Sequence, residues 1–187
     1  MGQMHFTHDT ELTLRAACVL VNSDRIGSER MGDQSALDSY LEAYGWTGRR
    51  DRDAEELKAV HRLRSRLGAI WGGAHDEAAT VDAVNALLAD THASPWLTRH
   101  PEMPEWHLHL ASTDDPLARR MGAEMAMALA DLIRAGELRR LKTCAAPDCE
   151  AVVIDLSRNR SRMFCDTGNC GNRQHVAAYR ERRSKDR

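Results

Sequence analysis

The sequence predicts a mainly α-helical protein in two parts, a helical body over residues 1–138 and a small C-terminal module over residues 139–187. Apolar residues recur at helical spacing through most of the body. Four of the five cysteines lie close together in the module. The charge divides in the same way, because the body has 14 basic against 22 acidic residues, whereas the module has 12 against 6. A basic segment on an acidic body indicates that only the module is attracted to a polyanion.

The body is expected to contain five amphipathic helices. Their apolar residues repeat every three to four positions over residues 11–21, 37–44, 57–71, 81–88 and 117–132. Thr10 is a suitable N-cap for the first helix, and Pro116 is typical of the first turn of the last one. Glycines follow three of the helices, at Gly45, Gly72 and Gly136, which favours an ending there.

Residues 95–116 interrupt the helical pattern. Four of the five prolines lie in this segment, and Trp106-His-Leu-His-Leu110 alternates between side chains of different polarity. Proline disfavours helix, and alternation with a period of two is typical of a strand. We therefore expect a short strand at residues 106–110 within the helical body.

The cysteines of the module form two pairs with equal spacing, Cys144-x4-Cys149 and Cys165-x4-Cys170. Zinc prefers four tetrahedral ligands, and two short loops with turn-forming residues can bring two such pairs together. We expect one structural Zn²⁺ held by four thiolates. The alternatives are an iron–sulfur cluster, two disulfides, a redox thiol and four unligated cysteines. The absence of a secretion signal and of any CxxC motif favours the zinc site.

The residues between the two pairs indicate a treble clef, the arrangement of loop, hairpin and helix around one ion. Residues 151–156 are expected to form a strand, residues 157–161 a turn, and residues 162–164 a second strand that returns beside the first. After Cys170 the pattern becomes helical, and Val176 and Tyr179 are expected to pack on the hairpin. The last cysteine would then lie at a helix N-terminus, where the helix dipole stabilises a thiolate.

The segment Cys170-Gly171-Asn172-Arg173, which ends a four-cysteine arrangement, resembles the CGNR zinc-finger family. Residues 140–144, 155–158 and 162–165 are similar to that family's flanking pattern, so the resemblance covers about the last 48 residues. The finger of this family usually follows a helical region named the ABATE domain, and its members are regarded as transcription regulators. The body is similar to that domain in residues 20–22, 37–46 and 107–110. Phe164 stands where the family often has Trp, and Gln174 and His175 stand where it often has basic residues.

Arginines of the module are the candidate contacts to nucleic acid, with DNA as the expected partner. They are Arg158, Arg160, Arg162, Arg173, Arg180, Arg182, Arg183 and Arg187. On a helix that begins near Cys170 the last five form a basic surface, and the first three alternate along the hairpin. Gly171 would permit close approach at the helix start, and Asn172 would hydrogen-bond to the cysteine loop. The alternative is a solvated basic surface or pairing with the acidic body.

Other residues give weaker indications of a site. His107 and His109 share a strand face near His100 and could hold a metal, although an exposed histidine pair is usually only surface. The helical spacing of Met121 and Met125 indicates core packing, and Cys18 is expected to be a small buried residue. The sequence contains no glycine-rich phosphate loop and no GxSxG motif, so we expect no enzymatic activity.

These observations predict a cytoplasmic DNA-binding transcription regulator. No stretch of the sequence approaches the roughly 20 apolar residues that span a bilayer, so we expect no membrane partner. The body would sense a small molecule or mediate assembly, for example as a homodimer. The alternative function is a zinc-stabilised protein–protein adaptor without specific DNA binding.

Overall fold

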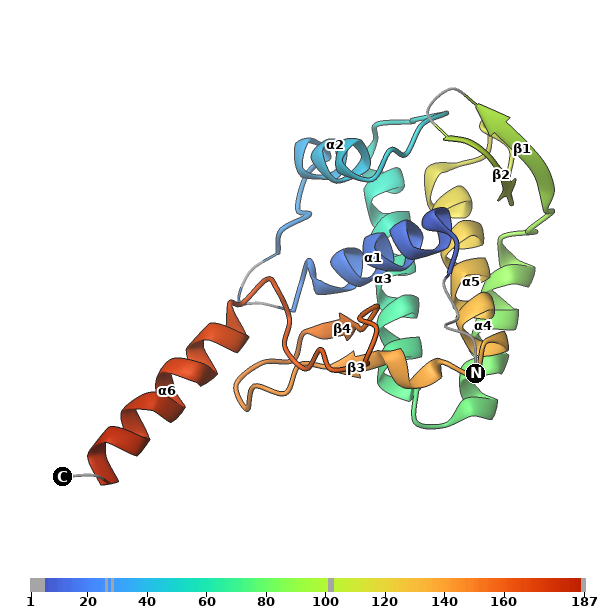
Figure 1. The fold of residues 1–187 in the computed structure, drawn as a ribbon. Helices are drawn as coiled ribbons and strands as arrows, with labels where there is room; N and C mark the ends of the chain where they lie inside the picture. The colour runs from blue at the N-terminus through green and yellow to red at the C-terminus, as the bar shows by residue number, and fades with distance from the viewer. Residues whose placement is uncertain (1–5, 26, 28, 101–102, 186–187) are drawn as a thin grey trace.

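The computed structural model describes residues 6–25, 27, 29–100 and 103–185 of the chain. Within these residues the protein is mainly helical, as predicted, with two small antiparallel strand pairs (Figure 1). The helices are α1 (His8–Asn22), α2 (Gln34–Ala43), α3 (Ala54–Gly73), α4 (Glu77–Asp90), α5 (Leu117–Arg134), the short 3-10 helix η1 (Leu138–Arg140) and α6 (Cys170–Lys185). The strands are β1 (Trp96–His100), β2 (Met103–His109), β3 (Leu141–Thr143) and β4 (Val152–Ile154).

Aspartates cap three of the body helices at their N-termini. The side chains of Asp33, Asp53 and Asp76 each accept a hydrogen bond from a backbone N–H three residues later, at 2.8–3.1 Å. Such caps satisfy backbone donors that have no partner inside the helix. The first helix differs from its prediction, since α1 begins at His8 with Thr7 as N-cap, and Thr10 is buried inside it.

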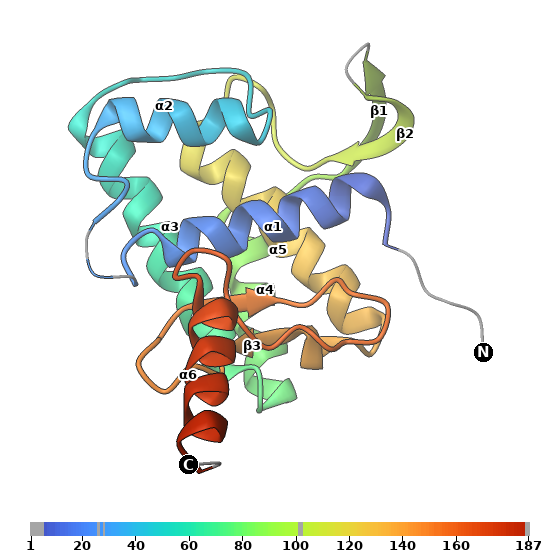
Figure 2. The same ribbon diagram turned by 60° about the vertical axis from the view of Figure 1, so that its left-hand side comes forward.

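The body core lies where α1, α3, α4 and α5 pack on one another. Helix α2 runs alongside α1, over the starts of α3 and α5 (Figure 2). Leu14, Leu67, Met121 and Leu129 are fully buried there. Burial of such side chains removes apolar surface from water, which is the main favourable contribution to folding. Met121 and Met125 belong to this core, so the prediction that they pack rather than bind is confirmed.

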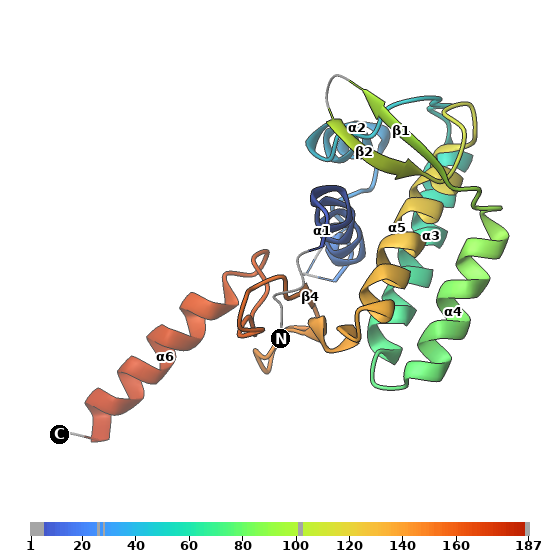
Figure 3. The ribbon, with the colours of Figure 1, turned by 45° about the vertical axis from the view of Figure 1, so that its right-hand side comes forward.

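A hairpin of two strands replaces the single strand expected at residues 106–110. β1 and β2 pair antiparallel, with Trp96 opposite His109 and Thr98 opposite His107. Cross-strand partners project from the same side of a hairpin, so these four side chains share one face. The hairpin lies over the N-terminal half of α1 and the start of α5 (Figure 3).

The second strand pair connects the C-terminal module to the body. β3 and β4 pair antiparallel, so the prediction that residues 151–156 pair with residues 162–164 was wrong. Leu141, Val152 and Ile154 lie in the body core, and Trp71 of α3 donates a hydrogen bond from Nε1 to the carbonyl oxygen of Val153 at 3.3 Å. The strands take this pairing because it buries their apolar side chains against α1 and α3.

None of the described helices has the length and apolar composition needed to cross a membrane.

Candidate metal centre and basic helix

The four cysteines of the module converge on one point. Their Sγ atoms all lie within 4.8 Å of one another. Cys165 Sγ is 3.7 Å from Cys149 Sγ and 3.6 Å from Cys170 Sγ. A tetrahedral zinc site with Zn–S distances near 2.3 Å has S···S edges of about 3.8 Å. The donor set and its spacing therefore fit one structural Zn²⁺, as the sequence predicted.

Backbone contacts from the strands and turns hold these sulfurs in place. Cys144 follows β3, and its N–H donates to the carbonyl oxygen of Ala151 at 2.8 Å. The backbone N–H of Cys165 donates to Cys144 Sγ at 3.4 Å. Cys170 is the first residue of α6, which confirms that the last ligand lies at a helix start. Local hydrogen bonds of this kind orient the ligands of a metal before the metal binds.

Gly168, one of the turn-forming residues of the second cysteine loop, lies against the sulfurs. A Cβ atom at Gly168 would lie 2.9 Å from Cys170 Sγ and 3.6 Å from Cys165 Sγ. Gly171, by contrast, has room for a Cβ at 3.5 Å from the ring of Phe164. The close approach that only glycine allows is thus needed at Gly168 in the loop before the helix. The signal was present in the sequence as a glycine inside the second cysteine loop.

The surroundings of the metal site shift the pKa values of the Cys149, Cys165 and Cys170 thiols. Burial raises the pKa of Cys165 to about 12 and also raises the pKa of Cys149. A hydrogen bond from the Arg173 guanidinium lowers the pKa of Cys170. Buried thiolates are costly without a compensating cation, and a divalent metal ion supplies that charge. Four thiolates also fill all positions of a tetrahedral ion, which is characteristic of a structural site.

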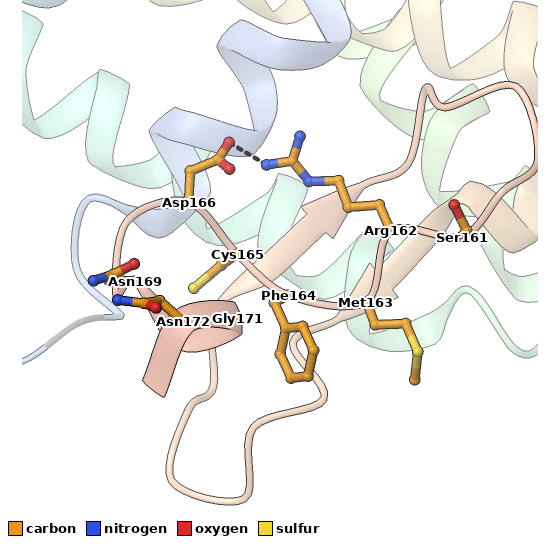
Figure 4. A pocket seen from close by; sticks show the side chains of 9 residues that line it. All are labelled: Ser161, Arg162, Met163, Phe164, Cys165, Asp166, Asn169, Gly171 and Asn172. Carbon is orange, nitrogen blue, oxygen red and sulfur yellow. Dashed lines mark ion pairs between the residues drawn. The ribbon is translucent and has the colours of Figure 1, made fainter. Parts of the chain in front are cut away.

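Three of the arginines predicted to contact nucleic acid are engaged within the protein. Arg173 donates from Nη2 to Cys170 Sγ at 3.3 Å and from Nη1 to Asp148 Oδ2 at 2.9 Å. Arg160 forms an ion pair with Glu137 at 3.2 Å, and Arg162 forms one with Asp166. Figure 4 shows the Arg162–Asp166 pair beside the cysteine loop. Arg173 therefore links the two cysteine loops, since Asp148 belongs to the first and Cys170 ends the second.

Arg158, Arg160 and Arg162 do not form the alternating row that a strand would give. Residues 157–160 form a turn, and Arg160 has a positive φ of 52°. The buried carboxylate of Asp155 organises this segment by accepting hydrogen bonds from Ser157 N–H at 3.0 Å, Arg162 N–H at 3.0 Å and Lys142 Nζ at 2.5 Å. The pKa of Asp155 is lowered overall. Burial favours a higher pKa, but the hydrogen bonds to the carboxylate outweigh the effect of burial.

Helix α6 projects away from the rest of the molecule (Figures 1 and 3). Its residues Arg180, Arg182 and Arg183 are exposed, and so is Arg158 on the turn. Val176 and Tyr179 are 40% and 55% exposed, so the prediction that they pack on the hairpin was wrong. The helix leaves the hairpin at Cys170 and does not return to cover it. Arg187 lies outside the described residues.

The remaining candidate residues have other surroundings. Asn172 is exposed on the first turn of α6, so the structure gives no support to a bond from its side chain back to the cysteine loop. Across the described residues, the four cysteines form the one cluster of three or more ligands that could hold a metal, and His107 and His109 are outside it. Cys18 is half-buried and also lies apart from the metal site, and burial raises its pKa to about 11.

Two family models match the sequence of this chain. Residues 140–183 match the model described as "CGNR zinc finger". Residues 14–136, about two thirds of the chain, match the ABATE model, described as "Putative stress-induced transcription regulator". No curated protein matches the sequence. The chain belongs to the ABATE family and carries a C-terminal CGNR zinc finger that holds one structural zinc ion.

Proposed function

We propose that this protein is a transcription regulator that binds DNA through α6 and the turn at Arg158. The observation that carries the proposal is an exposed basic helix that begins at a metal ligand and projects from an acidic body. The family description of the body as a transcription regulator supports the same role. In this proposal the protein works in the cytoplasm on DNA.

The shape of α6 suits the major groove of a DNA duplex. A helix of 16 residues is about 24 Å long. Because the major groove admits an α-helix, α6 can enter it without any change in the body. The zinc site fixes the direction of the helix at Cys170, and the link between Arg173 and Asp148 braces its first turn. The metal thus has a structural role here, and we assign the protein no catalytic activity.

The contacts that the proposal assigns to DNA are Arg158, Arg180, Arg182, Arg183 and Arg187. The guanidinium of Arg183 lies 5.9 Å from the ring centroid of Tyr179, which holds both side chains on one surface of α6. Arginine binds phosphate oxygens bidentately, so we assign these residues to the DNA backbone. Arg160, Arg162 and Arg173 are assigned structural roles because they already have acidic partners.

Fluorescence anisotropy with a random-sequence duplex tests this assignment. We expect binding to weaken steeply with salt, and the triple variant R180Q/R182Q/R183Q to lower the slope of log K against log salt by about 3. The variant R15Q/R62Q/R134Q removes the same charge from exposed positions of the body and should keep the wild-type slope. No binding of duplex at low salt, or equal slopes for the two variants, would contradict the proposal.

The adaptor function remains the second candidate, and the exposure of Val176 and Tyr179 favours it. Apolar side chains left exposed on a helix often contact a partner protein. The double variant V176S/Y179S separates the two functions. DNA binding through arginines should change little in this variant, whereas docking to a partner protein through α6 would be lost. A single-stranded RNA of equal length serves as a comparison, since an exposed Tyr179 could stack on unpaired bases.

A further inference from the structure

A cleft of ≈ 810 Å³ lies in the body, away from the zinc finger. The residues that line it come from the N-terminal half of α1, the loop after α2, the β1–β2 hairpin and one side of α5. Figure 3 shows how these elements are arranged. Its volume is in the range of sites that hold drug-sized organic molecules. The segments that form it are far apart in the sequence, so the cleft exists only in the folded body.

Aromatic side chains supply much of the cleft wall. Tyr44 and Trp46 come from the loop after α2, and Trp96 and Trp106 come from the hairpin. Trp96 stacks on His109 with ring centroids 6.0 Å apart, yet it is still 42% exposed, and Trp106 is 65% exposed. Large aromatic surfaces left open to water beside a cleft favour an apolar or aromatic ligand.

The charged groups of the cleft are mainly acidic. Glu124 of α5 accepts a hydrogen bond at Oε1 from the Leu110 N–H at 3.1 Å, and His109 Nδ1 lies 3.9 Å from the same oxygen. Asp9 of α1 and Asp131 of α5 also line the cleft, and Asp131 is paired with Arg134 at 3.2 Å. These carboxylates come from two helices and surround one volume.

Arg120, which lines the cleft, uses its guanidinium to bind backbone carbonyl groups. Arg120 is buried, and its guanidinium donates hydrogen bonds to the carbonyl oxygens of Thr47, of Arg49 at 2.7 Å and of Asp115 at 3.0 Å. It therefore holds the loop after α2 against α5 and is not available to bind an anion. The negative charge of Asp9 and Glu124 is left to attract a cation, whereas Asp131 is already paired with Arg134.

Burial makes a negative charge on these carboxylates costly when no cation is beside them. Burial and, to a smaller extent, the negative charge of Asp9 raise the pKa of Glu124 to about 7. Burial likewise raises the pKa of Asp131, in spite of its pairing with Arg134. A cation bound among these groups would relieve their repulsion, and the faces of the aromatic rings would add cation–π attraction.

We propose that the cleft binds an organic cation, a protonated amine or quaternary ammonium with an aromatic or apolar body, whose charge lies against Glu124. The tryptophan and tyrosine rings contact the apolar body of this ligand. The site is independent of the DNA-binding role of α6, because none of its residues belongs to the zinc finger.

Two nearly isosteric ions of opposite charge test the proposal. Tetraphenylphosphonium is a cation and tetraphenylborate an anion, and both present four phenyl rings. Isothermal titration calorimetry at pH 8 with the zinc-loaded full chain should give a dissociation constant for the cation at least about tenfold lower than for the anion. Equal binding of the two ions, tighter binding of the anion, or no binding of the cation would overturn the proposal.

Matched variants locate the charge. Glu124→Gln keeps an oxygen that can accept the hydrogen bond from the Leu110 N–H. The variant should weaken binding of the cation by about tenfold without weakening binding of the anion. Glu77→Gln removes an exposed carboxylate on α4, outside the cleft, and should leave both ions unchanged. Trp106→Ala removes an exposed aromatic ring and should weaken the binding of both ions. If E124Q and E77Q behave alike while both retain zinc and helical circular dichroism, the assignment of Glu124 is wrong. Asp131→Asn is the second acidic variant should E124Q fail to fold.

Discussion

Asn22 and Val152 are joined by two reciprocal hydrogen bonds. The side-chain Nδ2 of Asn22 donates to the carbonyl oxygen of Val152 at 2.8 Å, and its Oδ1 accepts from the Val152 N–H at 2.8 Å. The side chain of Asn22, the last residue of α1, thus makes the same pair of hydrogen bonds to β4 that the backbone of a neighbouring strand would make. Since Val152 is buried, these bonds satisfy polar backbone groups that water cannot reach. The zinc finger is therefore fixed to the body at a defined point.

Asn22→Ala should destabilise the protein by about 2 kcal/mol, because it leaves the buried Val152 N–H without its partner and leaves the Val152 carbonyl oxygen with only the Cys18 thiol at 3.5 Å. Urea unfolding followed by circular dichroism measures the change. Asn85→Ala is the matched control, because it also replaces an asparagine by alanine in a helix, but at an exposed position of α4. We expect the control to stay within about 0.5 kcal/mol of wild type. Equal effects of the two variants would show that the Asn22–Val152 link contributes nothing.

Cys149→Ser should remove zinc, whereas Cys18→Ser should not. The wild-type protein and C18S are expected to carry about one zinc ion per chain, because Cys18 lies outside the cluster of four sulfurs. Mass spectrometry of the metal content measures this directly. In C149S the helical circular dichroism of the body should largely remain, while amide exchange in residues 144–170 rises. Full zinc content in C149S would contradict the four-cysteine site.

Gly168→Ala should lower zinc affinity by about tenfold, because its Cβ would press on Cys170 Sγ. Gly171→Ala is the control, since its Cβ meets the ring of Phe164 at ordinary contact distance. Competition with a fluorescent zinc chelator compares the two variants. A greater loss in G171A than in G168A would reverse the assignment of the close approach to the loop.

Glu124→Gln should stabilise the protein increasingly as the pH rises. The folded Glu124 keeps its proton up to about pH 7, whereas the unfolded side chain releases it near its ordinary pKa of 4.5. Between these values the unfolded state binds fewer protons, so this carboxyl lowers native stability as the pH rises.

The advantage of E124Q over wild type should therefore grow by about 1–3 kcal/mol between pH 4.5 and pH 8. Urea unfolding at several pH values measures it, and Glu77→Gln controls for the loss of one exposed charge. Asp9 and His109 also face Glu124, and both variants retain them. An advantage that is constant with pH would contradict the raised pKa.

Local patterns in the sequence were sufficient to predict the metal site and the class of fold. The spacing of Cys144, Cys149, Cys165 and Cys170 determines their convergence, because each pair lies in one short loop that can hold two ligands on one ion. The start of α6 at Cys170 and the helices of the body follow from patterns of a few residues. Such features depend on neighbours in the chain, which the sequence displays directly.

Tertiary structure decided the partners of residues that are distant in the sequence. β4 pairs with β3 rather than with residues 162–164, because Val152 and Ile154 are buried against the helical body in that arrangement. Arg160 and Arg173 were expected to face a polyanion, but they meet Glu137 and Asp148 on other segments. The acidic aromatic cleft also assembles from four separate segments. The packing of apolar surfaces determines which distant segments come into contact, and this packing depends on the three-dimensional fold. Spacing along the chain therefore predicts the metal ligands. It does not predict which charged groups and aromatic rings become neighbours in the folded protein.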